Sequence, residues 1–133
     1  MVVVTLPHTP ASATEARRRL VTDLRAQGLS SDDIADAELV LAEMVGNAVR
    51  HARPLPGGGL RTDWCVDDLQ VTLRVVDGGA ATRPNVQRTA EHTDAERGRG
   101  LAIVAAIASS WGAQHEGTTL ETWAVLDLTC PPR

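Results

Sequence analysis

The sequence contains no lysine, no phenylalanine and no tyrosine among its 133 residues. All thirteen basic side chains are therefore arginines, and seventeen acidic side chains outnumber them to give a net charge of −4. Binding to a nucleic-acid backbone needs a surface rich in positive charge, and proteins that bind single strands commonly stack the bases on aromatic rings. Because the chain lacks both features, we expect no nucleic acid as a partner.

Cysteines and long apolar runs are also scarce. Cys65 and Cys130 are the only cysteines, and their wide spacing fits neither a zinc site nor a redox pair, so we expect two free thiols that are buried or half-buried. The longest apolar run, residues 101–108, is far shorter than the roughly 18 residues of a membrane span. The first eight residues lack the pattern of a secretion signal. We therefore expect a cytoplasmic protein that does not enter a membrane.

The chain length suits one domain of ~100–200 residues, which we expect over residues 1–133. The apolar patterns predict elements in the order β-α-α-β-β-α-β-β. The strands are expected at residues 2–6, 60–66, 69–76, 114–116 and 119–128. The helices are expected from a capping box at Ser12 and Glu15 to Gly28, from residues 30–33 to about His51, and over residues 100–108. Strands and helices that do not strictly alternate favour an α+β two-layer sandwich, in which a mixed, mostly antiparallel sheet carries its helices on one face.

Three polar side chains recur one turn apart along the second predicted helix. Glu43, Asn47 and His51 stand at positions i, i+4 and i+8 and so lie on one face. The asparagine oxygen is a neutral, hard ligand that suits Mg²⁺, and a carboxylate one turn away can orient a nucleophile. A solvated helix face, in which Glu43 only supports the helix, is the alternative.

Asp77 directly follows the strand predicted over residues 69–76 and is itself followed by Gly78, Gly79, Ala80 and Ala81. A carboxylate at a strand end can accept a hydrogen bond from an amino group on a flat ring, and small neighbours let such a ring approach the backbone. The same residues are equally typical of a plain turn.

Glycines and arginines open the last predicted helix, in the sequence Glu96-Arg-Gly-Arg-Gly-Leu101. Backbone N–H groups at a helix N-terminus attract anions, and the two arginines add positive charge. We therefore expect phosphate binding here, with a flexible helix entry as the alternative. A dinucleotide-binding fingerprint is not matched, because residue 103 is isoleucine and no strand directly precedes the motif.

In this order the three elements resemble the motifs of one superfamily. Residues 39–52 look like the N box, residues 76–79 like the G1 box and residues 98–101 like the G2 box of the GHKL ATPases. The resemblance extends over residues 5–128 and includes Gly117-Thr118-Thr119. Within the superfamily the chain is similar to the short, single-domain bacterial anti-sigma-factor serine kinases, the actinobacterial members in particular.

This resemblance implies a Bergerat-type sandwich that binds ATP and Mg²⁺. It implies that Glu43 is the catalytic base that activates an attacking hydroxyl, that Asn47 is the protein ligand of Mg²⁺, and that Asp77 accepts the adenine amino group. The other residues that it implies in ATP binding are Gly79, Ala81, Gly98, Arg99, Gly100, Leu101 and Thr119, with Thr118 as an alternative hydroxyl. It also implies an ATP lid over about residues 79–99.

Two features depart from the family pattern. Ala81 replaces the second glycine of the G1 box, and the expected lid has no lysine. Positive charge on the phosphates must therefore come from arginine.

The resemblance implies a homodimer that phosphorylates a serine or threonine on a small anti-anti-sigma partner and sequesters a sigma factor. The alternative function is an ATP-gated protein-binding module without kinase activity, in which ATP only orders the lid. A structural adaptor that binds no nucleotide is a third interpretation, and it requires all three motifs to be coincidental.

Overall fold

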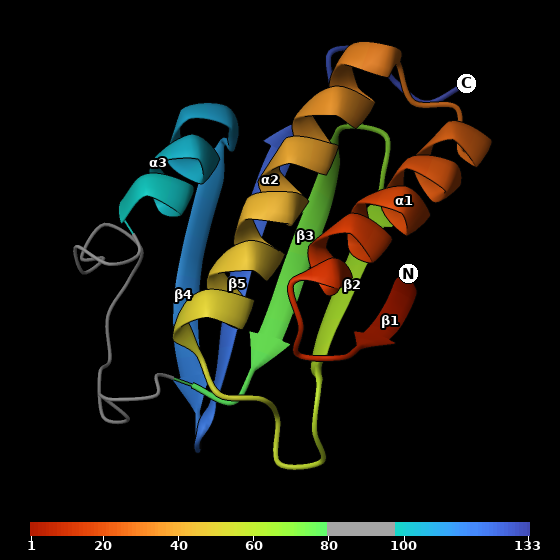
Figure 1. Cartoon of the computed structure of the whole chain (residues 1–133). Coiled ribbons are helices and arrows are strands. Elements are labelled where there is room, and N and C mark those ends of the chain that lie inside the picture. Colours follow the sequence, from red (N-terminus) through yellow and green to blue (C-terminus); the bar gives the residue numbers. More distant parts are fainter. Residues whose placement is uncertain (80–97) are drawn as a thin grey trace.

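The computed structural model is described for residues 1–79 and 98–133, with residues 98–100 described as backbone only (Figure 1). Within these residues the chain forms three helices and five strands, and the strands make up one sheet. The strands are β1 (Val2–Leu6), β2 (Leu60–Val66), β3 (Gln70–Asp77), β4 (Ser110–Glu116) and β5 (Thr119–Asp127). The helices are α1 (Ala11–Ala26), α2 (Ser31–His51) and α3 (Gly98–Ile107).

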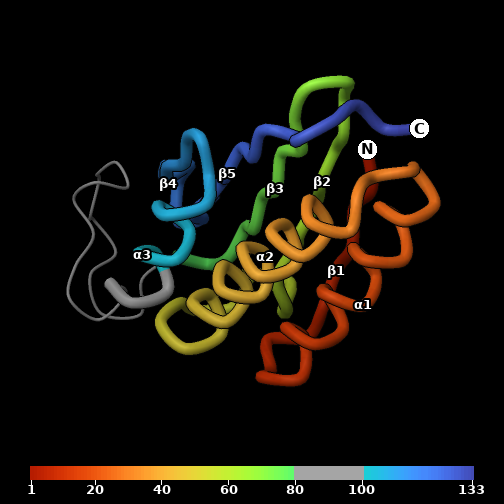
Figure 2. The backbone as a smooth tube through the Cα atoms, turned by 90° about the horizontal axis from the view of Figure 1, so that it is seen from above, coloured from red at the N-terminus to blue at the C-terminus, as the bar shows by residue number. Residues whose placement is uncertain are grey.

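The strands lie in the order β1-β2-β3-β5-β4, and each described pair is antiparallel. Figure 2 shows α1 and α2 along the same side of this sheet. Residues alternate along each strand, so that in β3 Val71, Leu73 and Val75 are buried toward the helices while Gln70 and Thr72 are only half-buried. One face of the sheet is therefore covered, and the core lies between it and the helices.

The order of elements and the α+β two-layer architecture predicted from the sequence are confirmed. The expected mixture of parallel and antiparallel pairs is not found among the described strands, which pair only in the antiparallel sense. Strand β4 begins earlier than predicted, at Ser110. Polar and apolar residues do not alternate clearly in its first four residues, Ser-Trp-Gly-Ala, so the sequence pattern did not predict them as part of the strand.

The start of α1 differs from the predicted capping box. The helix begins at Ala11 with Pro10 at its N-cap and no side-chain capping hydrogen bond. Ser12 lies inside the first turn, where its hydroxyl donates to the Pro7 carbonyl. Proline has a fixed φ that suits a helix start and no N–H to satisfy, so it displaced the serine from that position. The predicted end is confirmed, since Gly28 follows α1 with a φ of +86°.

The start of α2 follows the prediction. The Ser30 hydroxyl accepts a hydrogen bond from the Asp33 N–H at 3.2 Å. Asp33 is itself buried, and its carboxylate accepts hydrogen bonds from the backbone N–H and the hydroxyl of Thr129 at 3.0–3.1 Å. This pairing satisfies a buried charge and ties the first turn of α2 to the segment after β5.

Trp64 is the largest fully buried side chain, and it joins the two layers. It extends from β2 into the core, and its indole N–H donates to the Asp23 carboxylate of α1 at 2.8 Å. A buried indole N–H needs such an acceptor, because an unmade hydrogen bond in the core is costly. Asp23 therefore holds α1 at a defined position over the sheet.

The prediction of buried or half-buried thiols is wrong. Cys65 and Cys130 are free, and both are exposed. Cys65 follows the buried Trp64 along β2, so strand alternation turns it to the face of the sheet without helices. Cys130 lies beyond the end of β5. No helix in the described ranges is both long and apolar enough to cross a membrane.

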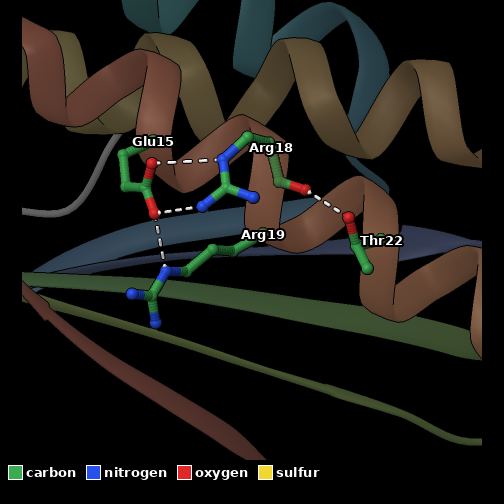
Figure 3. A network of polar contacts seen from close by, with 4 residues as sticks. All are labelled: Glu15, Arg18, Arg19 and Thr22. Carbon is green, nitrogen blue, oxygen red and sulfur yellow. Dashed lines mark hydrogen bonds and ion pairs between the residues drawn. The ribbon is translucent and has the colours of Figure 1, made fainter.

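An exposed ion-pair network stabilises the first turns of α1 (Figure 3). The Glu15 carboxylate accepts hydrogen bonds from the guanidinium of Arg18 at 2.7 Å and of Arg19 at 2.8 Å. These hydrogen bonds, that of Arg18 first, lower the pKa of Glu15 to about 2. The positions i+3 and i+4 place all three side chains on one side of the helix.

The lowered pKa of Glu15 gives a testable pH dependence. Because the folded pKa lies below the ordinary value of 4.5, the stabilisation is fully present above pH 4.5 and is lost as the pH falls toward 2. An NMR titration should find the Glu15 carboxyl with a pKa of about 2, and replacing both Arg18 and Arg19 by alanine should return the pKa toward 4.5. An ordinary pKa in the unmodified protein would contradict the network.

Asp23→Ala should lower the free energy of unfolding by about 1–3 kcal/mol, because it leaves the buried Trp64 N–H without an acceptor. Asp36→Ala is the matched control, since it removes an exposed carboxylate from a helix. Urea denaturation of the two variants measures the difference. Equal stabilities would show that the hydrogen bond to Trp64 contributes nothing.

Candidate functional site

Helix α2 buries one of the polar residues singled out from its sequence. Asn47 is 5% exposed, and the helical repeat places it on the flank of α2 that also carries the buried Val40 and Met44. Glu43 and His51, one turn before and after it, are half-buried. A solvated stripe would leave the central amide exposed, so burial of Asn47 argues against that alternative.

The two polar atoms of the Asn47 side chain differ in their surroundings. Its Oδ1 accepts a hydrogen bond from Nη2 of Arg50 at 3.3 Å. Its Nδ2 is buried, and no described residue offers it an acceptor. Leaving a buried donor unpaired costs about 1–3 kcal/mol. An oxygen of a bound anion or of a metal-bound water would satisfy such a donor, so the amide fits a ligand site.

Asp77 is the second buried polar residue of the site, at 2% exposure. It is the last residue of β3, and the strand alternation that buries Val71, Leu73 and Val75 turns it to the helix-covered side. Its Oδ1 accepts a hydrogen bond from the Gly79 N–H at 2.8 Å. This bond holds the carboxylate at the strand end and curls the following glycines around it.

Two backbone hydrogen bonds bring these two parts of the chain together. The Arg53 N–H donates to the Gly79 carbonyl at 2.8 Å, and the Gly78 N–H donates to the Arg53 carbonyl at 2.7 Å. Arg53 lies just beyond the end of α2, which carries Asn47, and the glycines directly follow Asp77. The C-terminal end of α2 is therefore tied to the end of β3.

Both glycines are required by close backbone contacts. A Cβ on Gly78 would collide with the Pro54 carbonyl oxygen and lie 2.8 Å from that of Arg53. Gly79 has a φ of +89°, and its Cβ would lie 2.5 Å from the Thr118 carbonyl oxygen in the β4–β5 turn. The turn after Asp77 is thus held between two backbone segments, which leave no space for a side chain. The sequence motif alone does not give this reason for glycine.

The third sequence motif, at residues 98–101, lies at the start of α3. Gly98, Arg99 and Gly100 are the first three residues of the helix, so the N–H groups predicted to bind phosphate are at a helix N-terminus. Leu101 is 7% exposed and belongs to the hydrophobic core, which leaves only its backbone available to a ligand. Ala81 and residues 80–97 of the expected lid lie outside the described residues.

The structure does not bring the Thr119 side chain together with Asp77. Its hydroxyl donates to the Glu116 carbonyl at 2.8 Å within the β4–β5 turn. Leu120 and Ala124 are buried toward the helices, so alternation turns Thr119 to the opposite face of the sheet.

Thr122 carries a hydroxyl and lies outside the sequence motif. It has the same parity along β5 as the buried Leu120, which is opposite Asp77 in the sheet register. Thr122 therefore lies on the helix-covered side, diagonal to Asp77 at about 7–8 Å between Cα atoms. The alternation of residues 120, 122 and 124 was the signal that could have found it.

No group of three histidine, cysteine, aspartate or glutamate side chains that could hold a metal ion occurs in the described ranges. A cation at Asn47 would therefore take most of its ligands from water or from the phosphates of a nucleotide. Mg²⁺ binds proteins in this way, because it keeps several waters and accepts few protein ligands. The donor set present thus fits Mg²⁺ that arrives with phosphate.

Comparison with known proteins identifies similar sequences and folds. A family model described as the histidine kinase-like ATPase domain matches residues 6–124. The fold is similar to a crystal structure of the RsbU and RsbW domains of Rv1364c from Mycobacterium tuberculosis, with a TM-score of 0.74 and 24% sequence identity. The match covers 99% of this chain and 33% of that one, so the present chain spans about a third of its length. No curated protein matches the sequence.

Gly78→Ala should destabilise the protein by about 1–3 kcal/mol, the usual cost of forcing extra volume into a packed position. The added Cβ would push against the Pro54 carbonyl oxygen and part the two backbone segments that join α2 to β3. Gly57→Ala is the matched control, because a Cβ there meets nothing within 4 Å. Thermal unfolding of both variants tests this, and a neutral Gly78→Ala would refute the close contact.

Proposed function

The chain belongs to the histidine kinase-like ATPase domain family, and from that premise we propose that it is a Mg·ATP-binding regulator with serine/threonine kinase activity. Membership in the family implies nucleotide binding. The observation that carries the proposal is the pair of buried polar residues, Asn47 and Asp77, at the tied ends of α2 and β3.

Each part of the site has a role in this proposal. The Asp77 carboxylate accepts the adenine amino group, and Thr118 or Thr122 adds a hydroxyl. The backbone N–H groups of residues 98–101 bind the phosphates, with Arg99 adding positive charge. The Asn47 oxygen holds Mg²⁺, which neutralises phosphate charge when it is bound. Gly79 leaves room for the purine, and Ala81 is included among the proposed ATP-binding residues.

Glu43 is the proposed catalytic base. It lies one turn before Asn47 on α2, so its carboxylate and the amide oxygen share a side of the helix. In the reaction a serine or threonine oxygen of the partner attacks the γ-phosphorus while Glu43 takes the hydroxyl proton. The bond from the γ-phosphorus to the bridging oxygen breaks, and ADP leaves.

The proposed partners follow from the resemblance to anti-sigma-factor kinases. The similar structure contains an RsbW domain, and its likeness to this chain agrees with that resemblance. We propose an anti-anti-sigma protein as the substrate and a sigma factor as the sequestered partner. A cytoplasmic homodimer formed from one domain over residues 1–133 completes the proposal.

Asn47→Ala should weaken Mg·ATP binding at least about tenfold, because it removes the metal ligand, whereas Glu43→Gln should keep binding and lose phosphoryl transfer. Isothermal calorimetry measures binding. Intact-mass spectrometry of a purified anti-anti-sigma protein after incubation with Mg·ATP measures transfer.

Asp36→Ala, an exposed change on the same helix, is the control for both variants. Asn47→Ala that binds Mg·ATP like the parent would refute the site assignment. Binding by the parent without any mass gain of one phosphate on the partner would favour the ATP-gated binding module over the kinase.

A further inference from the structure

Arg50 contacts the residue on which the proposed metal site depends. It lies in the last turn of α2 and is exposed, yet its Nη2 donates to Oδ1 of Asn47 at 3.3 Å. A guanidinium carries only donors, so the atom that it contacts is the amide oxygen rather than the nitrogen. The oxygen proposed to hold Mg²⁺ is therefore paired with a fixed positive charge.

Gly46 leaves the space that this arrangement uses. A Cβ on Gly46 would lie 3.0 Å from Nη1 of Arg50 and 3.7 Å from its Cζ and Nη2. The guanidinium thus lies against the helix surface at a position without a side chain. Any larger residue there would push the guanidinium outward and away from Asn47.

Two cations cannot share the Asn47 oxygen. A guanidinium and Mg²⁺ on the same acceptor would be only a few ångströms apart, where like charges repel strongly even near a protein surface. Binding of the metal ion therefore requires Arg50 to leave Asn47. Phosphate that binds without the metal instead requires Arg50 to stay near Asn47, because its positive charge then favours the anion.

We propose that Arg50 is a positioning residue that occupies the Asn47 oxygen in place of Mg²⁺ and yields to the metal when it binds. The inference rests on the proposed function, since it takes Asn47 as the metal ligand. Arg50 supports metal-free nucleotide binding and competes with Mg²⁺. It thereby reduces the difference in nucleotide affinity between the metal-free and metal-loaded protein.

A merely structural role for Arg50 has a different consequence. A cation in the last turn of a helix interacts favourably with the helix dipole, so its removal would lower stability alone. Competition predicts two opposite shifts instead: weaker binding of ATP without metal and tighter binding of Mg²⁺ in the presence of ATP.

The test compares Arg50→Gln and Arg50→Lys with the unmodified protein by calorimetry, using ATP in the presence of a chelator and Mg²⁺ titrated at fixed ATP. Arg50→Gln should weaken metal-free ATP binding about tenfold, the size of one charge-assisted hydrogen bond, and lower the half-saturating Mg²⁺ concentration severalfold. Arg50→Lys should recover part of the metal-free binding, because it restores the charge. Arg25→Gln, an exposed arginine on α1, is the control.

Gly46→Ala provides a second test that keeps the arginine. Its Cβ should displace the guanidinium from Asn47 and lower the half-saturating Mg²⁺ concentration, while alanine raises the intrinsic helix propensity. A shift in thermal stability without the two opposite binding shifts would overturn the inference. An unmodified protein that binds no ATP with Mg²⁺ would refute the proposed function itself. If the unmodified protein binds ATP with Mg²⁺ and the variants have the same ATP and Mg²⁺ affinities as the parent, only the role of Arg50 is refuted.

Discussion

The site depends on one short piece of backbone pairing, between Arg53 and the two glycines after Asp77. Its two hydrogen bonds, at 2.7 and 2.8 Å, tie the end of α2 to the end of β3. These bonds add a directional constraint to the apolar packing between the helix that carries Asn47 and the strand that carries Asp77, because apolar packing is not directional. Hydrogen bonds restrict both distance and orientation, so this pairing sets where the buried polar groups lie.

The polar residues inside the protein differ in whether their side-chain atoms have hydrogen-bond partners. The carboxylates of the buried Asp33 and the half-buried Asp23 have partners that join distant segments, Thr129 and Trp64 respectively. Asn47, in contrast, keeps a buried amide donor for which the described residues offer no acceptor. A buried polar group without a partner requires an explanation, and a bound ligand or ion at the site is one. The burial of Asn47 therefore carries more functional information than its position in a sequence motif.

Local patterns predicted most of the fold. The order of elements, the N-cap at Ser30 and the end of α1 at Gly28 follow from residues that are close together in the sequence. The misses have local causes too: Pro10 replaced the capping box, and an unclear alternation hid the first residues of β4. Exposure of Cys65 was missed because it depends on which face of the sheet the helices cover, and no single strand determines that.

By itself the sequence determined which segments become helices and strands and which residue types could bind a nucleotide, because both depend on neighbours within a few positions. Only the tertiary structure decided why Gly78 and Gly79 must be glycines, since the atoms that crowd them belong to Pro54 and Thr118. It also decided that Thr122 rather than Thr119 shares a face with Asp77. These relations join residues far apart along the chain, so they exist only once the sheet register and the packing of α2 are formed.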